Sequence, residues 1–291
     1  MRILDGKKTA EAVRQEIKKD VAAWVAKGNK KPHLAAVLVG DNGASLTYVN
    51  AKIKDCEEVG FKSSLIKLSD TITEAELLEQ IEKLNNDDSL DGYIVQLPLP
   101  KHINEGKITQ AISPLKDVDG FHPENLGKMV LNMPTFLPAT PYGIMQLLEY
   151  YSVDTSGKHC VVIGRSNIVG TPVSILMSRN NDPGNATVTL AHSRTQNLEA
   201  LIKDADILIV ALGKPDFIKG NMIKEGAVVI DVGITRVTDK SKKRGYRVAG
   251  DVEFEGVSKK ASFITPVPGG VGPMTRVSLL KNTLLACKRK A

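Results

Sequence analysis

The sequence has few aromatic residues and few cysteines. Only 4% of its 291 residues are Phe, Trp or Tyr, which is too few for the stacking platform of a single-strand nucleic-acid binder. Its three cysteines, Cys56, Cys160 and Cys287, lie far apart and form no Cys-x-x-Cys pair. Neither a disulfide framework nor a zinc site is therefore expected, and we expect a cytoplasmic protein without a bound metal.

The chain also lacks any apolar run close to the roughly 18 residues that a membrane-spanning helix needs. Its first residues, M-R-I-L-D-G-K-K-T, do not contain the continuous apolar core of a secretory signal. The net charge is +6, but the positive residues are spread out apart from residues 240–247 and 288–290. With no basic stripe and no recognition module, nucleic-acid binding is not expected, and a general attraction for anionic small molecules is the simpler interpretation.

Short apolar segments alternate with amphipathic ones along the whole chain. Helical spacing of apolar residues predicts a helix that ends near Gly28, a second helix over about 45–59 and a third that opens with a capping box of Thr73 and Glu76. Strands are predicted at 34–40, 61–68, 91–97, 158–164, 187–191, 206–211 and 227–232. Strands separated by helices indicate parallel βαβ units, so we expect two α/β domains that join near residue 138.

Three local signals predict the ends of further elements. The proline-rich stretch at 133–143 ends with Thr140 as a candidate N-cap residue and Pro141 at the first helical position. Residues 244–250 are predicted to form half of a small β-ribbon, because K-S-K-K-R-G has turn chemistry. Pro273 is expected to open a final helix of about 15 residues.

A glycine-containing turn between a strand and a helix is the first candidate binding site. In V-V-I-G-R-S-N-I-V-G-T-P (161–172), Gly164 and Gly170 are separated by five residues, so the segment does not match Gly-x-Gly-x-x-Gly. Glycine still allows close approach of the backbone, and a helix N-terminus attracts phosphate. The turn alone is compatible with a nucleotide site or with an ordinary tight turn.

The end of the next strand bears on which nucleotide would bind. NAD-preferring sites usually place an acid there to hold the ribose 2′-hydroxyl, whereas this chain reads A-H-S-R-T (191–195) with Ser193, Arg194 and no carboxylate. Arg165 supplies another cation near the turn. These groups suit a 2′-phosphate and favour NADP over NAD, although Arg194 taken alone is equally compatible with a surface charge.

Tyr48 and Lys52, in S-L-T-Y-V-N-A-K (45–52), are four residues apart and share one face of the predicted helix. They are either catalytic partners or part of a half-buried stripe. The Tyr-x-x-x-Lys pattern also occurs in short-chain dehydrogenases, but there the glycine-rich turn precedes the pair on one domain. Here Gly164 follows Lys52 by more than a hundred residues, so that family is rejected.

Seven segments, taken together and in order, resemble the bifunctional methylenetetrahydrofolate dehydrogenase/methenyltetrahydrofolate cyclohydrolase family. The resemblance covers nearly the whole chain. The segments are V-G-D-N-G-A-S-L-T-Y-V-N-A-K (39–52), V-Q-L-P-L-P (95–100), K-D-V-D-G-F-H-P-E-N-L-G (116–127), P-A-T-P-Y-G (138–143), G-R-S-N-I-V-G-T-P (164–172), D-V-G-I (231–234) and P-G-G-V-G-P-M-T (268–275).

The resemblance implies an architecture and an activity. A catalytic, folate-binding α/β domain would comprise residues 1–138 and the returning segment 269–291, and a Rossmann-type NADP-binding domain would comprise 139–268, with the active cleft between them. The enzyme would oxidise 5,10-methylenetetrahydrofolate with NADP⁺ and hydrolyse the methenyl product to 10-formyltetrahydrofolate. The family also suggests a homodimer.

The resemblance further implies a role for each site residue. Lys52 would be the general acid/base of the cyclohydrolase step, Tyr48 would stack on the aminobenzoate ring and help to position Lys52, Gln96 would hydrogen-bond Lys52, and Asp119 would bind the pterin edge. These roles suit the residue types, because a lysine in a dry cleft loses its proton readily and one carboxylate can accept two adjacent pterin N–H groups. The remaining implied residues are Pro268, Gly269 and Gly270 for substrate, and Gly164, Arg165, Ser166, Ser193, Arg194 and Ile234 for cofactor.

Simpler interpretations of the same residues exist without the resemblance. Asp119 before Gly120 is compatible with turn chemistry, Gln96 with satisfying the backbone near a strand end, and residues 266–273 with a tight loop before a helix. Two rival functions also remain, namely a monofunctional dehydrogenase on the same scaffold and a non-catalytic pyridine-nucleotide sensor.

Arg276 departs from the family pattern, which usually has an aliphatic residue after P-M-T. Its charge in the first turn of the last helix opposes the helix dipole slightly. We expect Arg276 either to face solvent or to meet the glutamate tail of folate.

Overall fold

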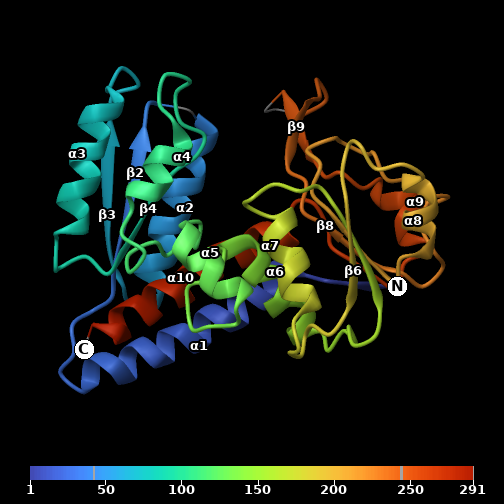
Figure 1. The fold of residues 1–291 in the computed structure, drawn as a ribbon, viewed down its shortest axis with the longest axis horizontal. Coiled ribbons are helices and arrows are strands. Elements are labelled where there is room, and N and C mark those ends of the chain that lie inside the picture. The colour runs from blue at the N-terminus through green and yellow to red at the C-terminus, as the bar shows by residue number, and fades with distance from the viewer. Residues whose placement is uncertain (42, 243–244, 291) are drawn as a thin grey trace. The chain divides into compact units, whose positions relative to one another are not determined.

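The computed structural model describes residues 1–41, 43–242 and 245–290. The chain forms two compact units (Figure 1). One contains Met1–Ala10 and Thr140–Thr275, and the other contains Glu11–Ala139 and the chain from Arg276 onward. The expectation of two α/β domains is confirmed. The boundaries 1–138 plus 269–291 and 139–268 stay a prediction, since they concern which segments bind folate and NADP.

The unit that begins at Glu11 is built on a three-stranded parallel sheet. β2 (His33–Val39) lies in the centre, between β3 (Lys62–Leu68) and β4 (Gly92–Val95). Every residue of β2 is buried, as expected for an apolar strand inside a parallel sheet. The connections contain α2 (Gly43–Val59) and α3 (Glu74–Asn85), whose predicted capping box of Thr73 and Glu76 is confirmed.

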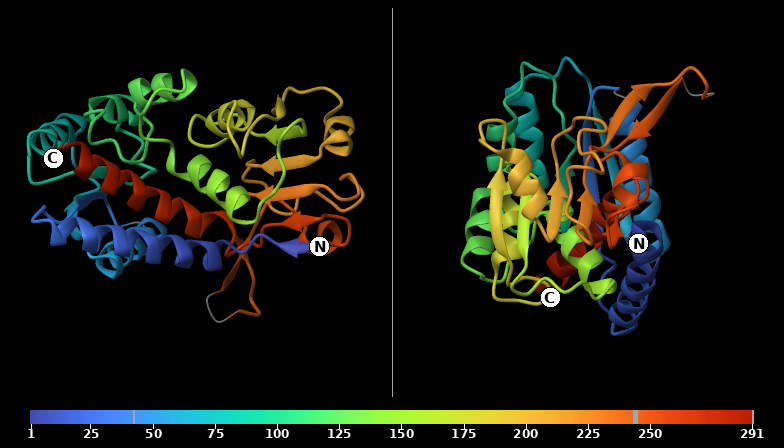
Figure 2. Two further views of the ribbon diagram at one scale, coloured as in Figure 1. Left: turned by 90° about the horizontal axis from the view of Figure 1, so that it is seen from below. Right: turned by 90° about the vertical axis from the view of Figure 1, so that its right-hand side faces the viewer.

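Two long helices complete this unit. α1 (Gly6–Ala26) and α10 (Val271–Arg289) run side by side in Figure 1 and in the left view of Figure 2. In α10 the amide of Asn282 donates to the carbonyl oxygens of Val118 and Leu137 at 2.8 and 2.9 Å. The C-terminal helix is therefore tied to the segment that precedes residue 139.

Two short helices of this unit were not predicted. α4 (Glu105–Ala111) begins after Asn104, whose side chain accepts from the Lys107 backbone N–H, and α5 (Pro123–Val130) begins after His122, whose Nδ1 accepts from the Glu124 N–H at 3.1 Å. Helices of seven and eight residues show only two turns of apolar periodicity, so their caps are the stronger signal.

Two predicted helix starts were wrong. α6 (Ala139–Tyr150) already includes Thr140, so Thr140 is not its N-cap; the Thr140 hydroxyl lies 3.0 Å from that of Thr275. α10 begins at Val271, two residues before Pro273. Proline is tolerated there because the N–H groups of the first turn have no partner within the helix.

The other unit is built on a six-stranded parallel sheet. Its strands lie in the order β1 (Arg2–Ile3), β11 (Phe263–Ile264), β8 (Val228–Asp231), β7 (Ile207–Val210), β5 (His159–Ile163) and β6 (Thr187–Ala191). Its helices include α7 (Gly170–Ser178), α8 (Leu198–Asp204) and α9 (Phe254–Ser258). The chain leaves β5 toward β6 on one side and then returns to β7 on the other. This reversal is the position where open α/β sheets bind ligands, beyond the carboxyl ends of the strands.

The predicted ribbon near residue 246 is confirmed as the antiparallel pair of β9 (Thr235–Thr238) and β10 (Tyr246–Ala249). The Arg236 guanidinium lies 4.7 Å from the centre of the Tyr246 ring. Residues 243 and 244, in the predicted turn, lie outside the described part of the chain.

Within the described ranges, no helix is both long enough and apolar enough to cross a membrane. The three cysteines are buried free thiols. The same residues contain no cluster of three or more His, Cys, Asp or Glu side chains arranged to hold a metal ion.

Candidate functional site

Lys52 is joined to Gln96 by a direct hydrogen bond. The Lys52 Nζ on α2 donates to the Gln96 Oε1 at 3.2 Å. Gln96 directly follows β4, and its backbone N–H donates to the Val37 carbonyl of β2 at 2.9 Å. Its side-chain amide nitrogen donates to the Leu97 carbonyl at 2.8 Å. Because the amide N–H is engaged in this way, the amide oxygen is the end that faces Lys52.

Asp119 is placed by a neighbouring aspartate that forms the turn. The segment before it is attached to β4, since the Tyr93 N–H donates to the Lys116 carbonyl at 3.1 Å. The buried Asp117 carboxylate accepts from the Gly120 and His122 N–H groups at 3.2 and 2.7 Å. Asp117, which the sequence reasoning did not single out, therefore performs the turn chemistry considered for Asp119.

Glycine is required at position 120. Its φ is +77°, and a Cβ there would lie 2.6 Å from the Leu137 carbonyl carbon and 2.7 Å from the Pro138 nitrogen. No L-residue with a side chain fits that space at that dihedral angle without backbone movement. The Asp119–Gly120 peptide is therefore held in one conformation, which fixes where the Asp119 side chain starts.

The electrostatics of Lys52 and Asp119 are coupled. Burial lowers the pKa of Lys52, the Asp119 charge opposes that effect, and the Arg276 charge adds to it. Burial likewise raises the pKa of Asp119, and the Lys52 charge opposes it. Burial also raises the pKa of Cys56, one turn beyond Lys52, to about 12, so at neutral pH it is an uncharged thiol. The site thus contains a lysine shifted toward its neutral, proton-accepting form.

Tyr48 lies one helical turn before Lys52 on α2 and is 40% exposed. An aromatic ring with that exposure has a face available for stacking. The unit therefore brings Lys52 and Gln96 into contact, with Asp119 and Tyr48 close by, although Lys52 and Gln96 are 44 residues apart in the sequence.

The candidate nucleotide turn lies at the strand reversal of the six-stranded sheet. Gly164 follows β5, and its N–H donates to the Ala191 carbonyl at the end of β6 at 2.9 Å. A Cβ on Gly164 would lie 2.2 Å from the Ala211 oxygen, just beyond β7. A Cβ on Gly170 would lie 1.8 Å from the Gly164 oxygen. Both glycines are thus required by close backbone approach at the edge where ligands bind.

The side chains around this turn suit an anionic ligand. Arg165 and Ser166 follow β5, Ser193 and Arg194 follow β6, and all four are exposed. Neither arginine forms an ion pair within the part of the chain that the structure describes. α7 begins here with no acidic residue in its first turn and no side-chain cap, so its N-terminal N–H groups can face phosphate. These residues fit NADP, whose phosphates would occupy this cationic edge.

The remaining predicted residues follow the next strands of the same sheet. Ile234 comes after β8 and is 48% exposed. The loop that contains Pro268, Gly269 and Gly270 comes after β11, and its Gly269 has a φ of +115°. Ile234 reaches this loop region, because a Cβ on Gly272 would lie 3.6 Å from its Cδ1. All predicted residues of this unit therefore lie beyond carboxyl ends of parallel strands.

Two buried aspartates that the sequence reasoning missed hold these loops in place. The Asp231 carboxylate accepts from the N–H groups of Gly233, Asp251 and Val252 at 2.9–3.0 Å. The Asp251 carboxylate accepts from those of Leu212, Gly213 and Lys214 at 2.6–3.0 Å. For Asp231 the signal in the sequence was an aspartate at a strand end with glycine two residues later, as in D-V-G-I (231–234).

Asp231 predicts a pH dependence of stability. Burial raises its pKa from 3.8 to about 6, so the folded protein binds a proton more tightly than the unfolded chain does. Its contribution is present in full below pH 4 and is lost as pH rises through 6, by up to about 3 kcal/mol. We expect the unfolding free energy of the protein, measured in urea, to fall across this range relative to that of Asp231→Asn, which does not titrate. A pH-independent difference between the two proteins would contradict this assignment.

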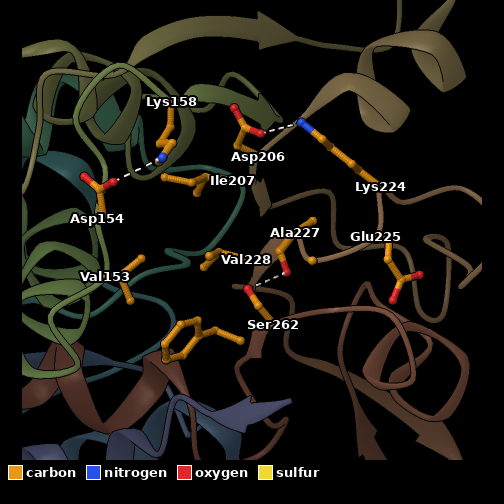
Figure 3. Close-up of a pocket in the computed structure, with 12 residues that line it drawn as sticks. Val153, Asp154, Lys158, Asp206, Ile207, Lys224, Glu225, Ala227, Val228 and Ser262 are labelled. Atoms are coloured by element: carbon orange, nitrogen blue, oxygen red, sulfur yellow. Dashed lines mark hydrogen bonds and ion pairs between the residues drawn. The ribbon is translucent and has the colours of Figure 1, made fainter.

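A cavity of about 280 Å³ lies at the opposite, amino-terminal ends of the strands, where Ile207, Val228 and Phe263 line it (Figure 3). Two ion pairs lie in its lining. Lys158 lies 3.1 Å from Asp154, and Lys224 lies 2.5 Å from Asp206. Glu225 is the fifth charged residue of this lining, so both lysines are matched by carboxylates and neither is left over to hold an anion.

The fold and the two sets of residues define an α/β enzyme with a lysine-based acid–base centre and a dinucleotide-binding sheet edge. The family model for the catalytic domain of tetrahydrofolate dehydrogenase/cyclohydrolase matches residues 4–119, and the model for the NAD(P)-binding domain of the same family matches 138–291. The chain therefore belongs to the tetrahydrofolate dehydrogenase/cyclohydrolase family.

Individual relatives match over their full length. The chain is 66% identical over 290 residues to the bifunctional protein FolD of Cytophaga hutchinsonii, with all of both chains covered. It superimposes on the crystal structure of the bifunctional FolD enzyme of Campylobacter jejuni with a TM-score of 0.93 at 46% identity, covering all of both chains. The Trypanosoma brucei enzyme, solved with NADP cofactor and an inhibitor, gives 0.92 at 39% identity over 98% of this chain and 97% of that one.

Proposed function

We infer that the chain oxidises 5,10-methylenetetrahydrofolate with NADP⁺ and hydrolyses the methenyl product to 10-formyltetrahydrofolate. Membership of the family supports both activities. The observation that supports the hydrolytic one is the bond from the Lys52 Nζ to the Gln96 amide oxygen, beside the charge of Asp119. A half-buried lysine with a lowered pKa and a fixed hydrogen-bond partner can both take and return a proton.

The hydrolysis can be written with Lys52 as the proton carrier. Neutral Lys52 accepts a proton from water as the water oxygen bonds to the methenyl carbon. The resulting Lys52 ammonium then gives that proton to N5 of folate as the bond between N5 and the former methenyl carbon breaks. The hydroxyl proton leaves to solvent as the formyl C=O forms, so one proton is released overall. The hydrogen bond to Gln96 keeps the amine oriented in both steps.

The other residues of this set bind and orient folate. Asp119 would accept from adjacent N–H groups of the pterin, for which a carboxylate without a competing turn bond is suited. Tyr48 would stack on the aminobenzoate ring. Pro268, Gly269 and Gly270 would contribute backbone groups to the folate site.

The dehydrogenase step requires alignment rather than a base. NADP⁺, when bound, accepts the hydride. Gly164 and Gly170 would allow its phosphates to approach the backbone, and Arg165, Ser166, Ser193 and Arg194 would hold them. Ile234 would supply an apolar contact beyond β8.

Arg194 predicts the preference for NADP⁺. Arg194→Ala is expected to lower the ratio of kcat/KM with NADP⁺ to that with NAD⁺ by about 10–100-fold, the typical effect of losing one charge-assisted hydrogen bond to a phosphate. Initial rates with the two nucleotides measure the ratio. Arg247→Ala removes another arginine of this unit, one paired with Asp216, and should leave it unchanged. If the ratio of kcat/KM with NADP⁺ to that with NAD⁺ is unchanged in Arg194→Ala, Arg194 does not bind the 2′-phosphate and is an ordinary surface charge.

We also propose a cytoplasmic homodimer. Three buried free thiols suit a reducing compartment, and the family suggests the dimer. A monomer mass in sedimentation equilibrium would contradict it.

The rival functions of a monofunctional dehydrogenase and a nucleotide sensor are separated by following NADPH formation and methenyl decay independently.

A further inference from the structure

A buried carboxylate joins the three helices around Lys52. Asp55 on α2 is only 4% exposed. Its Oδ2 lies 3.0 Å from an Arg276 Nη on α10, and its Oδ1 lies 3.6 Å from an Arg14 Nη on α1. Arg14 also approaches the carboxylate of Glu58 at 3.4 Å. The expectation that Arg276 faces solvent or meets the folate tail is therefore wrong in its first part, because its side chain is 25% exposed and paired inside the protein.

This pair lies next to Lys52. Asp55 follows Lys52 by three residues on the same helix, which brings their Cβ atoms to about 5–6 Å. Asp55 holds the Arg276 guanidinium on that face of α2. An arginine guanidinium is a permanent positive charge in a protein.

Besides burial, Asp119 raises the pKa of Lys52 and Arg276 lowers it, while Cys56 is neutral around pH 7 because of its own raised pKa. Asp55, three residues beyond Lys52, is a second carboxylate on the same face of α2. Around Asp55 the charged groups are Arg276, Arg14, Glu58 and Lys54. Burial raises the pKa of Asp55, while Arg276 and Arg14 oppose that effect and favour its anion.

Stability alone is a weak reason for this arrangement, since a buried ion pair often contributes no more than an apolar pair of the same size. An arginine at position 276, paired with a buried acid one turn from the acid–base lysine, adds a positive charge to the electrostatic field at that lysine.

We propose that Arg276 is a positioning residue for the cyclohydrolase reaction: Asp55 holds its guanidinium beside Lys52, and this fixed positive charge sets the pH above which Lys52 acts as a base. The inference rests on the proposed role of Lys52. It assigns opposite effects to the two partners, because removing Arg276 leaves a negative charge near Lys52 and removing the Asp55 charge leaves a positive one.

The test is the pH profile of cyclohydrolase kcat/KM, corrected for spontaneous methenyl hydrolysis. We expect Arg276→Leu to move the rising limb to higher pH and Asp55→Asn to move it to lower pH. At a fixed pH on that limb, Arg276→Leu should therefore be about two- to tenfold less active than the parent, and Asp55→Asn should be more active by a similar factor. Arg276→Lys should stay near the parent, and the double variant Arg276→Leu/Asp55→Asn should return toward it.

The controls separate charge from structure. Lys107→Leu removes an exposed positive charge, paired with Glu74, in the same unit, and should not move the limb. NADP-dependent oxidation reports folding, and Arg276→Gln replaces the leucine variant if that activity is lost. The inference is overturned if the rising limb moves in the same direction in Arg276→Leu and Asp55→Asn. It is also overturned if the limb moves in neither variant. If Lys52→Met retains cyclohydrolase activity, it is instead the role of Lys52 that fails.

Discussion

Lys52→Met is expected to lose cyclohydrolase activity by about 10²–10⁴-fold, the usual contribution of a positioned acid–base group. It should keep most of its NADP-dependent oxidation. Methionine preserves the length of the side chain but cannot carry a proton, and it leaves the Gln96 oxygen without its donor. The hydride-transfer step needs no base, so its rate should change only as far as folate alignment changes. Methenyl decay and NADPH formation, followed in separate assays, measure the two activities.

A matched control is Lys62→Met, which removes an exposed lysine at the amino-terminal end of β3 in the same unit, the end of the sheet opposite to Gln96. Both activities should be retained there. Cyclohydrolase activity that survives in Lys52→Met would remove Lys52 from the reaction. Equal loss of both activities would indicate that Lys52 mainly binds folate.

Gly170→Ala is expected to weaken NADP⁺ binding by at least about tenfold and to destabilise its unit by about 1–3 kcal/mol. The added Cβ would lie 1.8 Å from the Gly164 oxygen and 2.5 Å from its carbonyl carbon. Both are backbone atoms, so the turn itself has to open. Equilibrium titration with NADP⁺ and thermal unfolding measure the two effects.

Gly127→Ala provides the matched control for this substitution. Gly127 lies within α5, and a Cβ there would meet no atom within 4 Å. Alanine should be neutral or slightly stabilising at that position because it favours the helix. Unchanged NADP⁺ affinity in Gly170→Ala would mean that the turn does not hold the cofactor.

Much of the fold could be predicted from the sequence where one signal dominates. The strand at 187–191 is observed as β6, at the same residues, since a short apolar run between turn residues has few alternatives. The start of α10 was placed late because Pro273 is permitted anywhere in a first turn. α4 and α5 were missed because two turns give too little periodicity for recognition.

The site was harder to predict because its contacts join distant segments. Tyr48 and Lys52 share a helix, but neither their spacing nor their residue types indicate that Gln96 lies against Lys52. That expectation came from the resemblance. Asp117 and Asp119 are indistinguishable by type, and only the hydrogen bonds to Gly120 and His122 show which one forms the turn. Arg276 was noticed as unusual, yet its partner Asp55 becomes visible only when α2 and α10 are packed together.

The pairing of β1 with β11 and the attachment of α10 through Asn282 determine when during synthesis the two units can fold. The six-stranded sheet takes its edge strand from residues 2–3 and that strand's neighbour from residues 263–264. The other unit takes its closing helix from residues after 275. Before residues 263–264 have left the ribosome, neither unit has all of these parts, so the N-terminal unit cannot complete its folding first, as N-terminal domains generally do. Both units therefore reach their final form only after the segment from residue 263 onward has been synthesised.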